Sequence, residues 1–299
     1  MTIFRHKRSV GSEEAEQINC ARSNSLFKEY EVGPGIFKLA EGPFISYQRT
    51  VDIDMQTSDF EVTETFSYKI SAPFWHYLLH FPMKRALKNS NSSKNFNIWW
   101  APPNRFDALT SRTVSLLCVA AIVTGFLGAL IGQTATFAAE EFGAGDRAQG
   151  ILLATVRIGV LLTVFITALA DNRGRKKLLE FSLYGGCCLA VLSAVAPNLW
   201  ALGITQSLAR GFATSISILI GIMAAEAAPK GSRAYIAGLL TLSAGLGAGI
   251  PVWILFLADL HLKGWRLLFA TALIFFPVIR WIHLHLEESK RFINHIENQ

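Results

Sequence analysis

The sequence predicts an all-α membrane protein, a six-transmembrane-helix bundle that follows a small α+β N-terminal cytoplasmic extension. Hydrophobic residues make up 51% of the 299 residues, and only 17% are charged, against about 25% in soluble domains. Charge is concentrated at the front, because residues 1–112 hold 14 of the 28 basic and 12 of the 22 acidic side chains. The remainder contains successive apolar stretches close to the ~20 residues that cross a bilayer.

The polar front of the chain divides into two parts. Residues 1–42 are polar and irregular and are expected to be disordered or to lack regular structure. Residues 43–98 are expected to form a small α+β cytoplasmic unit. Within it, the alternating runs 43–54 and 60–70 predict a two-stranded hairpin, and residues 74–88 have apolar side chains at helical spacing.

Two strands and one helix bury too little apolar surface to be stable alone. The unit is therefore expected to pack on the membrane domain or to be the remnant of a larger domain. Its order of strand, strand and helix resembles the tail of a helix-grip (START-like) lipid-binding domain.

Residues 99–112 are expected to be a linker, in which Trp99-Trp100 forms an interfacial aromatic anchor. The transmembrane domain is expected over residues 113–292, with a cytoplasmic tail at 293–299. Six spans are predicted within it, at residues 113–137, 150–170, 178–196, 199–225, 235–257 and 267–286.

The charges of the connecting segments predict the orientation. Residues 172–177 are strongly basic and residues 230–233 are basic, whereas the connections before and between them are balanced or neutral. Because basic loops stay on the cytoplasmic side, both chain ends are predicted to lie in the cytoplasm.

Several function classes find no support in the sequence. The net charge of +6 could suggest nucleic acid, but the largest basic cluster lies between two apolar spans, so no nucleic-acid partner is expected. The four cysteines lack metal-ligand spacing, and His283 and His285 point to different sides of a helix. Nothing resembles a P-loop or a catalytic triad. We therefore expect no enzyme activity, no cofactor and no metal.

The loop between the second and third spans, Leu169 to Lys177, carries a specific motif. Asp171 can cap a helix end, Gly174 permits a tight turn, and Arg175 with Lys176 offers cations to a carboxylate or to a helix C-terminus. Asp, Gly, Arg and Lys at these spacings resemble the cytoplasmic loop signature of the major facilitator superfamily.

Further segments match the same family in its N-terminal half. Arg210 in the fourth span resembles the family's fourth-helix arginine motif. The turn from Glu226 to Arg233 resembles the charged turn after helix four of the sugar-porter-like branch. Gly264-Trp265-Arg266 resembles the start of the sixth helix, and residues 286–292 resemble the degenerate segment that follows it.

This resemblance covers residues 113–292 and implies half of the twelve-helix major facilitator fold. It implies a secondary carrier in the plasma membrane that contacts membrane lipid and moves a small-molecule substrate by alternating access. A second six-helix half is then expected, as a missing C-terminal part or another chain, and a fragment or split gene is favoured over a homodimer. It also implies a cytoplasmic conformational latch made of Asp171, Gly174, Arg175, Lys176, Glu226 and Arg233.

Two arginines within the spans are candidates for substrate binding or ion coupling. A charge at the centre of a spanning helix costs about 2.5–3.5 kcal/mol on insertion scales, so Arg157 and Arg210 need a partner or a function. Each could instead bond a backbone carbonyl or extend to water. Gln133 and Thr134 could hydrogen-bond a substrate, although polar residues in bundles often bond a neighbouring helix.

A second function remains open at this stage. The front unit could capture or sense a lipid-like ligand, with the helices serving only as a membrane anchor. A full sheet encoded upstream of Met1 would favour this function over transport.

Overall fold

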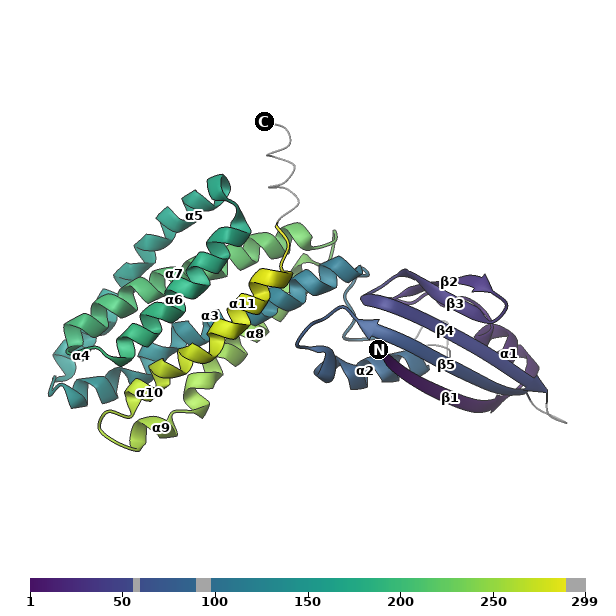
Figure 1. The fold of residues 1–299 in the computed structure, drawn as a ribbon, viewed down its shortest axis with the longest axis horizontal. Helices are drawn as coiled ribbons and strands as arrows, with labels where there is room; N and C mark the ends of the chain where they lie inside the picture. Colours follow the sequence, from purple (N-terminus) through teal and green to yellow (C-terminus); the bar gives the residue numbers. More distant parts are fainter. Residues whose placement is uncertain (56–59, 90–97, 289–299) are drawn as a thin grey trace. The chain divides into compact units, whose positions relative to one another are not determined.

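The computed structural model describes residues 1–55, 60–89 and 98–288 (Figure 1). The chain forms two compact units. The front unit comprises Met1–Ser115 together with Ala228–Tyr235, and the bundle comprises Leu116–Ala227 together with the residues from Ile236 onward.

The front unit contains one antiparallel sheet in the order β1-β5-β4-β3-β2, with two helices. The first strand pairs with the last, so that Thr2 lies opposite Tyr68. In chain order the elements are β1 Thr2–Val10, α1 Ser12–Ile18, β2 Lys28–Gly33, β3 Ile36–Glu41, β4 Phe44–Met55, β5 Phe60–Ile70 and α2 His76–Asn89.

The expectation that residues 1–42 are disordered or irregular is wrong, because they hold three of the five strands and α1. Many of the polar side chains of β1 occupy its exposed positions, and its backbone is paired with β5, which is distant in sequence. A local pattern cannot reveal that pairing. The predicted hairpin is confirmed as β4 and β5, and the predicted helix as α2.

Aromatic side chains fill the space between the sheet and α2. Phe4 stacks on Phe66 with ring centroids 4.7 Å apart, at the edge of this cluster. The buried members from strands, loops and α2 are Leu26, Phe27, Phe44, Tyr47, Phe66, Tyr68, Met83, Ala86, Leu87 and Ile98. This core fixes α2 to the sheet by one side of the helix only.

The front unit also buries a network of ion pairs. The side chains of Arg49 and Glu64 are fully buried, and Arg49 Nη1 lies 3.2 Å from Glu64 Oε1. Arg49 Nη2 donates to Glu29 Oε2 at 2.7 Å, and Arg22 pairs with Glu64. Tyr47 donates to Glu29, and burial together with the Glu29 charge raises the pKa of this phenol well above its usual value. Charges are tolerated here because each has a partner.

The bundle contains six helical segments that are long and apolar enough to cross a membrane, counted over the described residues. They are α3 Ala108–Glu141, α4 to α5 over Asp146–Leu169, α6 Arg175–Ala194, α7 Leu199–Ala227, α8 to α9 over Arg233–Asp259, and α10 to α11 over Trp265–His285. A short 3-10 turn, Gly159–Leu161, joins α4 (Asp146–Ile158) to α5 (Leu162–Arg173). The six predicted spans are confirmed.

Glycines allow two pairs of spanning helices to touch at the backbone. A Cβ on Gly125 of α3 would lie 1.9 Å from the carbonyl oxygen of Ala244 on α8, and a Cβ on Gly247 of α8 would lie 2.0 Å from that of Ile122. A Cβ on Gly159 would similarly lie 1.7 Å from the Ser207 carbonyl oxygen on α7. Close approach of this kind is how helices associate in lipid, where apolar burial gives little driving force.

We predict that Arg49→Leu destabilises the front unit by about 3–5 kcal/mol, because it removes a buried cation that pairs with two buried carboxylates, Glu29 and Glu64. Lys7→Gln is the matched control: its ion pair with Glu61 is 2.6 Å long, but Lys7 is exposed, and such a pair contributes at most about 1 kcal/mol. The stability of the front unit in both variants is measured by hydrogen exchange of the sheet amides in the detergent-solubilised chain. Equal protection in the two variants would contradict the prediction.

We predict that Gly247→Ala loosens the contact between α3 and α8, since the new Cβ would clash with backbone that cannot rotate away. Gly245→Ala on the same helix serves as the control, because a Cβ there meets no atom within 4 Å. Thermal unfolding in detergent should show a clearly lower midpoint for Gly247→Ala alone. The packing account fails if both glycines tolerate alanine equally.

Candidate functional site

The turn between α5 and α6 depends on Gly174. The residue adopts φ of 92° between the end of α5 and the start of α6, a backbone conformation that side chains with a Cβ rarely adopt. Gly174 is buried, and the turn lies at one end of the bundle (Figure 1). We call this end, with the charged residues described next, the inner cluster.

Arg175 and Glu226 form an ion pair that joins the start of α6 to the end of α7. Their side chains are only 17% and 11% exposed. A cation in the first turn of a helix and an anion in the last turn are each disfavoured by the helix dipole. The pairing offsets both penalties, and each residue therefore depends on the other.

Glu288 ties the end of the sixth span to the same turn. Its carboxylate accepts a hydrogen bond from the backbone N–H of Lys176, with distances of 3.1 Å to Oε1 and 3.3 Å to Oε2. The N-terminal N–H groups of a helix have no partner within the helix, and they favour an anion. Glu288 follows α11 (Phe275–His285), so three spans meet at the inner cluster.

Glu180, one turn further along α6, was not singled out from the sequence. Its Oε2 lies 2.7 Å from Nδ1 of His283 on α11, and its Oε1 lies 3.9 Å from Nζ of Lys176. The spacing of Lys176 and Glu180 by four residues is the signal that could have identified it. The same contact places His283 opposite a carboxylate.

Four of the six predicted latch residues therefore lie together, namely Gly174, Arg175, Lys176 and Glu226. The Asp171 side chain lies outside the described part of the chain. Arg233 is exposed at the first residue of α8, within the front unit. The latch role of all six residues stays a prediction.

A second charged group, the outer cluster, occupies the opposite end of the bundle. Arg266 forms a bidentate pair with Glu141, in which Nε donates to Oε2 at 3.1 Å and Nη2 donates to Oε1 at 2.9 Å. Trp265 donates to Glu141 Oε2 at 2.7 Å, and Arg266 Nη1 donates to the Ala194 carbonyl at 3.0 Å. The ends of α3, α6 and α10 (Trp265–Ala270) are thereby joined. Trp265 and Arg266 were identified from the sequence through the family resemblance, but Glu141 was not identified as their acceptor.

The candidate substrate residues are more dispersed. Arg210 Nη1 donates to the Gly128 carbonyl of α3 at 3.1 Å, and the rest of the side chain is exposed. Thr134 is buried and its hydroxyl donates to the Leu130 carbonyl within α3, whereas Gln133 is half-buried. Arg157 is exposed on α4, with no ion pair to another described residue. Their roles in binding stay predictions.

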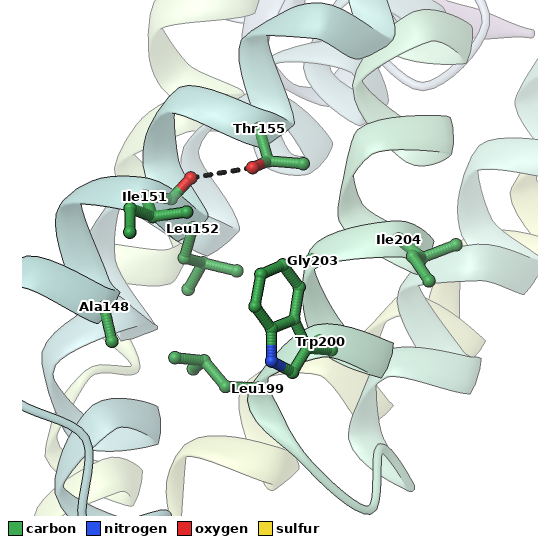
Figure 2. Close-up of a pocket in the computed structure, with 8 residues that line it drawn as sticks. All are labelled: Ala148, Ile151, Leu152, Thr155, Leu199, Trp200, Gly203 and Ile204. Carbon is green, nitrogen blue, oxygen red and sulfur yellow. Dashed lines mark hydrogen bonds between the residues drawn. The ribbon is translucent and has the colours of Figure 1, made fainter.

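A small crevice of about 100 Å³ lies between α4 and α7 (Figure 2). Its lining is almost entirely apolar, and the Thr155 hydroxyl donates within its own helix to the Ile151 carbonyl. Binding pockets for small polar ligands are larger and carry several convergent polar groups. The crevice is lined by Ala148, Ile151, Leu152, Thr155, Leu199, Trp200, Gly203 and Ile204 and does not meet that description.

Comparison with known proteins agrees with this architecture. A family model described as "Sugar (and other) transporter" matches residues 74–299. No curated protein sequence matches the chain. Among solved structures, a crystal structure of double-tryptophan variants of XylE is similar, with 17% sequence identity and a TM-score of 0.53.

The structural match covers 60% of this chain but only 45% of the XylE chain, so the two share a fold over less than half of XylE. The family match, in contrast, spans most of the present sequence and includes all six spans. The chain is therefore a multi-pass membrane protein that belongs to the sugar-transporter family of the major facilitator superfamily.

Proposed function

We propose that this chain is one six-helix half of a secondary transporter that carries a small molecule of the sugar class across the plasma membrane. Transport would proceed by alternating access, in which one six-helix repeat rocks against another around a site near the bilayer midplane. Both chain ends would lie in the cytoplasm, in keeping with the basic α5–α6 turn.

The inner cluster is the observation that carries this proposal. It gathers Arg175, Glu226 and Glu288 at the turn that carries the family's signature, and it ties three spans together there. A half that moves as one body must resist separation of its own helices. Partly buried ion pairs at the bundle end provide such resistance without placing charge in hydrocarbon.

The cluster would also act as a latch. Asp171 precedes Gly174 by three residues and Arg233 follows Glu226 by seven, and both are proposed to complete the latch. Such a latch needs little energy, because shifting the free-energy difference between two conformations by about 1.4 kcal/mol changes the ratio of their populations tenfold.

Arg210 is the proposed substrate-facing group. It reaches from α7 to the Gly128 carbonyl on α3, so it joins two spans without a carboxylate partner among the described residues. A guanidinium that uses one nitrogen on a carbonyl retains further donors. Those donors suit the hydroxyl oxygens of a sugar.

The first test is to read the full-length transcript and to assay uptake by its product. We expect a second set of six spans, either in the same reading frame or in a chain that copurifies, and uptake of radiolabelled hexoses or pentoses into vesicles. The ligand-sensor function would be supported instead by three results together: no second set of spans, no uptake, and a lipid-like molecule that copurifies with the front unit.

In the complete transporter, Arg175→Glu should lower uptake by about tenfold, because it places two carboxylates side by side at the inner cluster. The double variant Arg175→Glu with Glu226→Arg should recover most of the activity, since the pair is restored in the opposite sense. Uptake is normalised to the amount of inserted protein. A double variant no better than the single one would rule out the latch.

Gly128→Ala should raise the KM for the sugar by several-fold, because the added Cβ would lie 3.3 Å from Arg210 Nη1 and displace the guanidinium while keeping its charge. Gly132→Ala is matched to it, one turn later on α3, where a Cβ meets no atom within 4 Å. Initial rates over a range of sugar concentrations separate KM from kcat. Unchanged KM in both variants would remove Arg210 from the binding site.

A further inference from the structure

One face of α2 is left uncovered by the front unit. Tyr77, Leu78 and Phe81 are 82%, 68% and 73% exposed, although they are large apolar or aromatic side chains on a well-formed helix. The opposite side of the same helix, with Met83 and Leu87, is buried in the aromatic core. Exposed apolar groups gathered on one helix mark an interaction surface.

The exposed face changes character along the helix. Lys84, Arg85 and Lys88 are exposed in its second half, and α2 contains no acidic residue. At about 100° per residue these cations share the face of Tyr77 and Phe81. The surface is therefore apolar in the first half of α2 and cationic in the second.

The apolar half of α2 is anchored to the first spanning helix. Trp75 Nε1, just before α2, donates to the Ser115 carbonyl of α3 at 3.2 Å, and Ser115 Oγ donates to the Pro73 carbonyl at 2.7 Å. Ser71 Oγ also donates to the Ala108 carbonyl at 2.6 Å. Ser115 lies where the apolar stretch of α3 begins. All of these contacts lie within the front unit, which includes α3 as far as Ser115, and they tie the segment before α2 to the residues that directly precede the apolar stretch of α3.

We propose that α2 is a membrane-surface helix, with Tyr77, Leu78 and Phe81 in the boundary between headgroups and acyl chains. Lys84, Arg85 and Lys88 then lie against anionic lipid headgroups of the leaflet from which α3 enters. An exposed helix face that combines large apolar side chains with several cations and no acid has the two features that bind such an interface, namely apolar area to bury and charge to attract anionic lipid. Tyr77 suits it especially, because aromatic rings with a polar edge concentrate at headgroup level.

The occupant of this surface is a bilayer rather than a protein. A protein partner would have to supply both an apolar patch and acidic groups for three cations, whereas the inner leaflet supplies both at one surface. The apolar stretch of α3, which is long enough to cross a bilayer, also begins close to Ser115 in the sequence. Docking onto the bundle or onto a second transporter half is the alternative outcome of the experiment below.

The test places a fluorophore at Leu78→Cys or Phe81→Cys in the full chain after replacement of its four native cysteines. The protein is reconstituted in vesicles of phosphatidylcholine with about one-third phosphatidylserine. Quenching by spin-labelled lipid and by aqueous iodide is then compared. A label at Glu31→Cys, exposed on β2 of the same unit, is the matched control.

We expect the labels at 78 and 81 to be quenched several-fold more by spin-labelled lipid than the label at 31, and several-fold less by iodide. Iodide quenching equal to that at position 31 would overturn the proposal. Protection from both quenchers would also overturn it, because the face would then be covered by protein.

The role of the cations has its own variant. Replacing Lys84, Arg85 and Lys88 together by Gln should reduce lipid quenching at position 78 in the anionic vesicles to the level found in pure phosphatidylcholine. If the triple variant behaves like the parent in both lipids, anionic headgroups are not the ligand of this surface. These readouts do not require transport and are independent of the proposed function.

Discussion

The cost of placing charge in hydrocarbon governs how the bundle is held together. Its described ion pairs lie at the two ends, where Arg175 meets Glu226 and Arg266 meets Glu141. Between those ends the helices associate through backbone contact at glycines such as Gly125 and Gly247. Ion pairs are stable at the polar boundary of the membrane. Within the hydrocarbon, where burial of apolar surface gives helices little reason to associate, close backbone packing holds them together.

The ion pairs at the two ends join different sets of helices. The inner cluster joins α6, α7 and the end of α11, and the outer cluster joins the ends of α3, α6 and α10. Because α6 contributes to both, it links the two ends of the half. A half cross-linked at both ends can move as one body, as the alternating-access mechanism proposed above would require. The front unit meets the same electrostatic constraint differently, by pairing every charge of the Arg49 network inside a protein core.

Helix existence was predictable from the sequence because membrane spans depend on local composition. Six apolar stretches of sufficient length leave little choice of structure, as lipid requires each backbone polar group to be satisfied within its segment. The β1 strand was missed for the opposite reason: its partner β5 is about sixty residues away, and nothing local identifies that pairing.

The site was partly predictable by the same reasoning. Gly174, Arg175 and Lys176 form a contiguous motif, so their proximity follows from the chain. Glu226 was found because the family resemblance named its turn. Glu180 and Glu141 were not identified as ion-pair partners. The residues next to an acidic side chain near the edge of a span do not indicate which distant cation it contacts.

The most direct test of this account asks whether the two charged clusters lie on opposite sides of one membrane. Cysteines are introduced at Lys177 in the first turn of α6 and at Gly145 before α4, in a chain without its native cysteines, and sealed cells are treated with a membrane-impermeant maleimide. We predict labelling of Gly145→Cys in intact cells and of Lys177→Cys only after the membrane is opened. Labelling of both positions from the same side would contradict a membrane crossing between them, and with it the six-span topology on which the account of the bundle rests.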